Sequence, residues 1–197
     1  LLVGLLRKMD PFRSMVFVNT KRMAERLEDV LRANDINAQA LSGDVPQKKR
    51  LRFLEDFHAG KLAVLIATDV ASRGLHIPDV SHVFNFDLPQ DSADYVHRIG
   101  RTARAGAEGD AISFACEEYA VALPDIEKYI GRKLPYEPIT PDMLPEIKWP
   151  PRRSFAERGG RPGGGRPGGG RPGGGGRPGG SSSRGGPRGG RGRRGPG

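Results

Sequence analysis

Residues 63–69 have the sequence AVLIATD, and this stretch decides the fold class of the chain. A short, continuous apolar run that ends at polar residues is typical of a strand buried on both faces. Further strands are predicted at residues 15–18, 38–41, 80–86 and 111–115. Helical patterns alternate with these strands. The alternation predicts an α/β fold, in which an open parallel sheet is covered by helices on both faces.

The helices between the strands are predicted from the spacing of apolar residues and from start and stop signals. They are expected at residues 21–33, between Pro46 and Gly60, at residues 93–99 and at residues 117–130. In the second helix, Leu51, Leu54 and Phe57 are expected on the buried face. In the last helix, Pro124 is expected to interrupt the regular structure.

Polar residues follow three of the predicted strands. They are Asn19-Thr20-Lys21, Ser42-Gly43-Asp44 and Thr68-Asp69. Ligands of open parallel sheets bind beyond the carboxyl ends of the strands. Any polar loop could supply such residues once, but three at one edge favour a functional edge.

The last 47 residues differ in composition from the rest of the chain. Residues 151–197 hold 12 of the 32 basic side chains, all of them Arg, 21 of the 29 Gly, and 1 of the 23 acidic side chains. Residues 1–150 are therefore close to neutral, and the net charge of +9 comes from the tail. We expect a folded domain at residues 1–130, a proline-rich linker at 131–150 with Tyr136 and Trp149 as its packing residues, and a disordered basic tail at 151–197.

Composition also excludes several classes of protein. No apolar run is long enough to span a membrane, and the first residues lack the features of a signal peptide. Cys116 is the only cysteine, which excludes a disulfide framework and a cysteine-based zinc site, and no metal site is predicted. We expect a cytoplasmic protein without a membrane partner. Because Leu1 lies inside an apolar helical pattern, we also expect the chain to be the back part of a longer protein.

The densest group of functional side chains lies in residues 95–106, YVHRIGRTARAG. Arg101 and Arg104 present two guanidinium groups about one helical turn apart, which suits a polyphosphate because each group can bind phosphate oxygens in a bidentate manner. A solvated basic loop at the end of a helix is the alternative interpretation.

Four segments of the chain resemble motifs of the DEAD-box RNA helicases, in the order found in the C-terminal of their two RecA-like domains. They are His97-Arg98-x-Gly100-Arg101-x-x-Arg104, residues 64–80 (VLIATDVASRGLHIPDV), residues 15–21, and Gln47-x-x-Arg50 preceded by Ser42-Gly43-Asp44. The resemblance covers residues 15–106 and implies a RecA-like fold.

The resemblance assigns roles to individual residues. Arg101 and Arg104 resemble arginine fingers that contact the γ-phosphate of ATP held by another domain, which makes them the catalytic candidates. His97 and Arg98 are implied to couple the nucleotide state to closure of the two domains.

On the RNA side, the resemblance implies that Thr68 and Gly43 hold RNA phosphates and that Arg50 supports this edge. Asp69, Arg73 and Gly74 are implied to organise the loop after residues 63–67.

The chain departs from the family pattern at two positions. His76 stands where the family usually has an Asp that contacts the ribose, so His76 is only a possible nucleotide contact. Ala103 stands where Gly is usual, which is costly only if the backbone there needs a positive φ.

The resemblance implies an ATP-dependent RNA helicase that unwinds short RNA duplexes in RNA turnover. The sequence contains neither a G-x-x-x-x-G-K-[ST] loop nor an Asp-Glu pair suited to Mg²⁺. We therefore expect ATP and Mg²⁺ to be bound mainly by an N-terminal RecA-like domain of the same protein, and this chain alone to be inactive. Within the family, the chain is most similar to members of RNA-degrading assemblies (degradosomes), which implies ribonuclease E as a partner.

The tail resembles RGG segments, which bind single-stranded RNA through phosphate charge and guanidinium stacking. A solubilising linker is the alternative for the tail. For the whole chain, a non-catalytic RNA-binding or annealing protein and a DNA-translocating helicase of the same superfamily remain alternatives.

Overall fold

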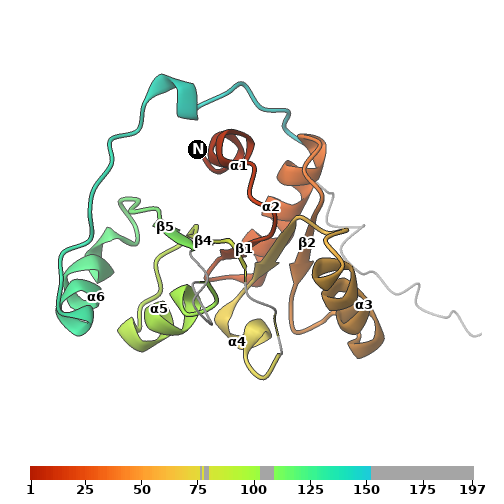
Figure 1. Ribbon diagram of the computed structural model, residues 1–197, viewed down its shortest axis with the longest axis horizontal. Helices are drawn as coiled ribbons and strands as arrows, with labels where there is room; N and C mark the ends of the chain where they lie inside the picture. The colour runs from red at the N-terminus through yellow and green to blue at the C-terminus, as the bar shows by residue number, and fades with distance from the viewer. Residues whose placement is uncertain (76, 78–79, 103–108, 152–197) are drawn as a thin grey trace, which may run out of the picture. The chain divides into compact units, whose positions relative to one another are not determined.

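A computed structural model describes residues 1–75, 77, 80–102 and 109–151 of the chain. Its centre is a sheet of five strands in which every pair is parallel (Figure 1). The strands are β1 (Ser14–Phe17), β2 (Ala38–Leu41), β3 (Val64–Ala67), β4 (His82–Asn85) and β5 (Asp110–Ser113), in the spatial order β2-β3-β1-β4-β5. The predicted α/β fold is confirmed.

Six α-helices and two short 3₁₀-helices are present in the described residues. They are α1 (Leu2–Met9), α2 (Lys21–Ala33), α3 (Gln47–His58), α4 (Asp69–Ser72), α5 (Ser92–Ile99), η1 (Ala120–Ala122), α6 (Leu123–Ile130) and η2 (Pro141–Met143). No helix among them is long and apolar enough to cross a membrane.

The two faces of the sheet have separate hydrophobic cores because successive side chains of a strand point to opposite faces. Val16 and Ile66 join the core that contains residues of α1 and α2. Met15 and Leu65 join the core that contains residues of α3 and α4. The sheet is therefore covered on both faces, as its apolar strands predict. Helices α5 and α6 pack on each other around buried Ile126.

The helices differ from the prediction in three details. Leu51 is half exposed, and Phe53 takes its place in the core beside Leu54 and Phe57. Pro124 lies in the first turn of α6, where a missing N–H costs nothing, so it begins that helix rather than interrupting it. Helix α4 was not predicted, because four residues are too few to show an apolar period.

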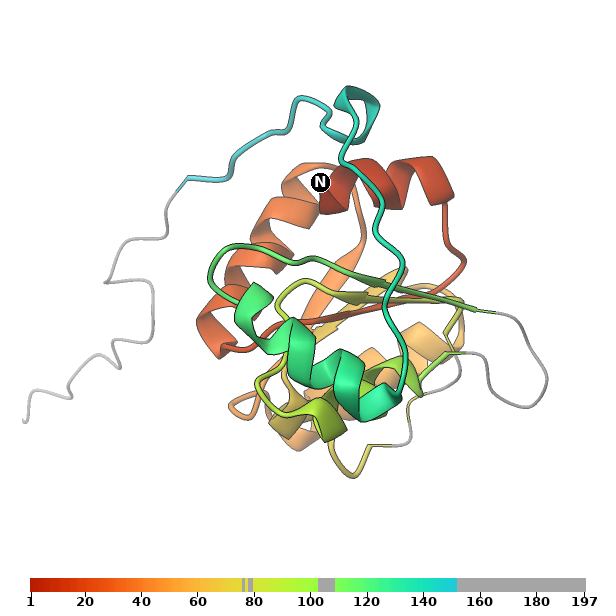
Figure 2. The same cartoon turned by 90° about the vertical axis from the view of Figure 1, so that its left-hand side faces the viewer.

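The segment after α6, which we call the strap (residues 131–151), returns across the domain to α1 and α2 (Figures 1 and 2). Its only regular element is η2. Asn34 at the end of α2 donates to the Lys148 carbonyl at 2.9 Å and accepts from the Lys148 N–H at 3.0 Å. Lys8 of α1 pairs with Asp142 at 2.9 Å. Ile147 packs against the core that contains α1 and α2.

Candidate functional site

Three helices begin at the carboxyl edge of the sheet, each with a side chain that caps its first turn. Thr20 accepts from the Met23 N–H at the start of α2, and Thr68 accepts from the Ala71 N–H at the start of α4. Asp91 does the same for α5. Caps of this kind satisfy backbone donors that have no partner in the helix. They fix the directions in which the three loops leave the sheet.

Arg98 joins these loops from the inside of the domain. Its Nε and Nη2 donate to the two carboxylate oxygens of Asp69 at 2.7 and 2.6 Å. Nη2 also donates to Asn19 Oδ1 at 2.9 Å, and Nη1 donates to the Asp87 carbonyl at 2.6 Å. The guanidinium lies 5.2 Å from the centre of the Phe17 ring, and the residue is 1% exposed. One buried cation therefore holds together the loops after β1, β3 and β4.

Asp87 also binds the backbone of Asn19, one of the Arg98 partners. Its carboxylate accepts from the Asn19 N–H at 2.8 Å. Burial raises the pKa of Asp87, while the Asn19 N–H and the charge of Arg98 act in the opposite direction.

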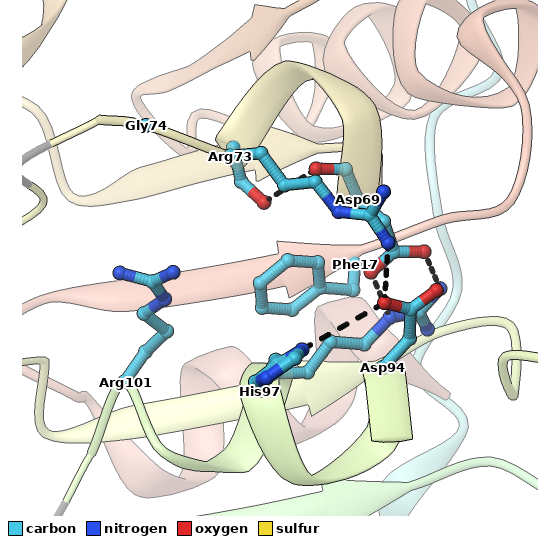
Figure 3. Close-up of a pocket in the computed structure, with 9 residues that line it drawn as sticks. Phe17, Asp69, Arg73, Gly74, Asp94, His97 and Arg101 are labelled. Atoms are coloured by element: carbon cyan, nitrogen blue, oxygen red, sulfur yellow. Dashed lines mark hydrogen bonds and ion pairs between the residues drawn. The ribbon is translucent and has the colours of Figure 1, made fainter. Parts of the chain in front are cut away.

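An open pocket of about 250 Å³ lies beside this network. Its lining comes from β1, from α4 and the loop after it, and from α5 (Figure 3). The residues are Phe17, Asp69, Ser72, Arg73, Gly74, Asp94, His97, Arg98 and Arg101. Three arginines and a histidine face two aspartates, so the lining suits an anionic ligand.

Arg73 and His97 are held at this pocket by one carboxylate. Arg73 Nη2 donates to Asp94 Oδ1 at 2.7 Å, and His97 Nδ1 lies 3.8 Å from the same oxygen. The hydrogen bond to Asp94 raises the pKa of Arg73, which stays a cation. The side chain of His97 is 72% exposed. His97 and Arg98, which share an expected role, are thus in different surroundings, because Arg98 is buried within the domain.

Arg101 follows α5 and lines the pocket from the other side of Phe17 in Figure 3. Its backbone is fixed because its carbonyl accepts from the Val80 N–H at 3.1 Å. The next residue, Thr102, donates from its hydroxyl to the Val80 carbonyl at 2.6 Å. The backbone at Arg101 and Thr102 is therefore held by Val80, which lies two residues before β4.

The residues expected to hold RNA lie at the same edge of the sheet but outside the pocket lining. Thr68 uses its oxygen as the α4 cap, so its hydroxyl proton remains a donor. Nothing lies within 4 Å of a Cβ built on Gly43, so the backbone there is open to a ligand. Arg50 donates to the Ala71 carbonyl at 2.7 Å and thereby ties α3 to α4.

Gly74 has φ +71°, a conformation that glycine adopts without strain. Arg104, His76 and Ala103 lie outside the described residues, as does the tail from residue 152.

Sequence reasoning missed the Arg98 partners Asn19 and Asp87 and the Arg73 partner Asp94. From the sequence, Asn19 is only a polar residue that follows a strand. Asp94 was detectable from the sequence, because an acidic residue in the first turn of a helix three positions before His97 shares its face.

Comparison with known proteins defines the class of this chain. Residues 1–106 match the model of the helicase conserved C-terminal domain, and the chain belongs to this family. It is a RecA-like domain of the DEAD-box type and resembles the ATP-dependent RNA helicase RhlB. RhlB of Xanthomonas axonopodis pv. citri is 57% identical over 152 residues, which are 77% of this chain and 27% of that protein. The chain thus spans about a quarter of the length of that relative.

Solved structures of DEAD-box proteins have a fold similar to that of this chain. Escherichia coli SrmB bound to regulator of ribonuclease activity A matches with a TM-score of 0.68 and 41% identity, over 76% of this chain and 88% of that one. Saccharomyces cerevisiae Dbp5 bound to RNA and ADP BeF3 matches with a TM-score of 0.61 and 39% identity, over 68% of this chain and 37% of that one.

Proposed function

We propose that this chain is the C-terminal lobe of an ATP-dependent RNA helicase that unwinds short RNA duplexes, coupled to ATP hydrolysis, in RNA turnover. The observation that carries the proposal is the position of Arg101. It lines a cationic pocket at the carboxyl edge of the sheet, on a backbone fixed by Val80. A guanidinium held in this way can meet a triphosphate presented by a facing domain.

The pocket chemistry supports a polyanionic ligand. Two of its cations, Arg98 and Arg73, are paired with Asp69 and Asp94 inside the site. We assign these two arginines to positioning. Arg101 is assigned to the phosphate because it lines the pocket and matches the first arginine-finger position of the motif. Arg104, three residues further on, is proposed as the second arginine finger from the motif alone, and His76 as a possible nucleotide contact on the same basis.

Coupling between domains is proposed for His97 and Arg98. His97, which is exposed, would contact the facing domain directly. Arg98 would act indirectly, because it fixes the loops that carry Asp69 and Asn19. ATP can favour the closed arrangement only through contacts made in that arrangement.

We propose that RNA lies along the edge formed by Gly43 and Thr68. The open backbone at Gly43 and the hydroxyl donor of Thr68 suit phosphate oxygens, and Arg50 holds α4 in place from behind. We assign to Asp69, Arg73 and Gly74 the role of fixing the conformation of the chain after β3. A domain of the same fold in Dbp5 occurs with RNA and ADP BeF3, which supports both ligands.

A second RecA-like domain is required for catalysis. The sequence holds no phosphate-binding loop of the G-x-x-x-x-G-K-[ST] type, and in the described residues no group of three or more His, Cys, Asp or Glu could hold a metal ion. An N-terminal domain would therefore bind most of ATP and Mg²⁺, whose role is to neutralise charge on the phosphates. The isolated chain is expected to show only background hydrolysis.

Replacement of Arg101 by Ala in a two-domain protein that contains this lobe tests the proposal. Loss of an arginine finger costs on the order of a thousandfold in turnover, so RNA-stimulated ATP hydrolysis should fall by about that factor. Arg52→Ala is the matched control, because Arg52 is exposed on α3. Unchanged hydrolysis in Arg101→Ala would contradict the role of Arg101 as an arginine finger. Absence of hydrolysis in the unmutated two-domain protein, with RNA binding intact, would favour the alternative of a non-catalytic RNA-binding protein, which the arginine-rich tail also suits.

We further propose a cytoplasmic location and an association with ribonuclease E in an RNA degradosome. The support is the similarity to RhlB. Co-purification of the tagged full-length protein with ribonuclease E from cytoplasmic extract, with and without ribonuclease A treatment, tests both points.

A further inference from the structure

The strap ends beside α2 with an exposed aromatic side chain. Trp149 is the only tryptophan of the chain and is 66% exposed. The guanidinium of Arg26 lies 6.0 Å from its ring centre. Lys148, the preceding residue, is fixed by two hydrogen bonds to Asn34, which is 2% exposed. The indole is thus carried on an anchored backbone, although it is itself mostly in solvent.

The indole contacts a helix that carries two exposed arginines. Arg22 and Arg26 are four residues apart and therefore neighbours on the exposed face of α2. The nearby carboxylates of Glu25 and Asp35 pair with Lys21 at 3.7 Å and with Lys148 at 3.2 Å. We call the group Arg22, Arg26 and Trp149 the strap platform.

The strap platform is close along the chain to two parts that the proposed function assigns to RNA. Helix α2 starts at the carboxyl edge of the sheet, where Thr20 caps it, and Arg26 is about 9 Å further along the helix axis at 1.5 Å per residue. Three residues after Trp149, the sequence continues into the arginine-rich tail. The platform is therefore on the helix that starts at the proposed RNA edge, and it comes directly before the arginine-rich tail in the sequence.

We propose that the strap platform is a binding site for single-stranded RNA, with one base stacked on Trp149 and the adjacent phosphates on Arg22 and Arg26. Aromatic rings accept any base by stacking, and arginines next to them track the backbone. This inference rests on the proposed RNA-binding function, and it assigns to the strap a contact that the helicase motifs do not include.

The sole tryptophan makes the test direct. A single-stranded uridine 12-mer is titrated into the 197-residue chain while the emission of Trp149 and the Kd are measured. Stacking should quench the emission in a saturable way. Trp149→Ala should weaken binding about fivefold or more, whereas Trp149→Phe, which keeps a stacking face, should stay within about twofold of wild type. Arg22→Ala should reduce the salt slope of log K by roughly 0.7, the value of one phosphate contact.

Tyr136→Ala is the matched control, because Tyr136 is 85% exposed in the same strap, before η2. It should bind RNA as wild type does. If wild type binds RNA with no quenching and Trp149→Ala binds as tightly, the platform serves another partner, and the inference is overturned while the proposed function stands. If wild type does not bind the RNA at all, the proposed function fails as well.

Discussion

At the scale of single residues, two arginines that pair with aspartates at the pocket differ in their surroundings. Arg98 is 1% exposed and makes four hydrogen bonds to three residues. The side chain of Arg73 is 66% exposed and donates one hydrogen bond of 2.7 Å, to Asp94. Removing one partner of a buried pair leaves an uncompensated charge, whereas solvent screens an exposed pair.

Arg98→Ala should therefore lower the free energy of unfolding by about 3 kcal/mol, because it leaves the Asp69 carboxylate without its partner. Arg73→Ala should lower it much less, because solvent screens the exposed pair of Arg73 with Asp94. Urea denaturation of the two variants measures the difference. Equal and small losses would mean that the buried network contributes little to holding the three loops together.

At the scale of elements, the close approach of η2 to α1 depends on Gly4. A Cβ on Gly4 would lie 2.1 Å from the Met143 carbonyl oxygen and 2.8 Å from Pro145 Cδ. The neighbour is backbone, which cannot move away without displacing the strap.

Gly4→Ala is expected to destabilise the protein by about 1–3 kcal/mol, the usual cost of overpacking. Helix propensity alone gives the opposite sign, since Ala is better than Gly in a helix by about 1 kcal/mol. The urea midpoint decides between the two effects. Gly43→Ala, where the added Cβ meets nothing within 4 Å, should show no loss of stability.

The strap also has an acid-sensitive contact. A hydrogen bond from Lys8 lowers the pKa of Asp142 below its ordinary value of 3.8. The stabilisation is then fully present above pH 3.8 and is lost as the pH falls through the lower, folded-state value. Wild type should be more stable than Asp142→Asn at neutral pH, and the two urea midpoints should converge as the pH falls below 3.8. A difference that persists in acid would contradict this assignment.

The elements also show what the sequence can predict. Strands β1 and β3 were found because continuous apolar runs have one structural meaning when polar residues close them. The path of the strap could not be predicted, because its contacts join residues more than 110 positions apart, such as Asn34 and Lys148. The sequence motifs identify Arg98 and Arg101 as site residues. The burial of Arg98 could not be predicted, because it depends on three loops that meet in space and no local pattern encodes their meeting.

At the scale of the whole molecule, charge is divided between a nearly neutral domain and a tail with 12 arginines. Deletion of residues 151–197 should weaken RNA binding regardless of sequence and flatten its dependence on salt. If every tail arginine met a phosphate, the tail would add about −8 to the slope of log K against log salt, at ~0.7 per contact in single strands. Titrations at several salt concentrations measure the slope, and an unchanged slope would favour the solubilising linker.

The route of the strap has a mechanical consequence. Because Asn34 and Lys8 bind the strap after it has left α6, a force that pulls on the chain beyond residue 151 would be transmitted to the layer of α1 and α2. Helices α5 and α6 lie earlier in the chain than these contacts, so the force would not pass through them or through the residues from α5 to Arg101. If the tail binds RNA as proposed, a load on the tail would therefore leave Arg101, the proposed arginine finger, in place.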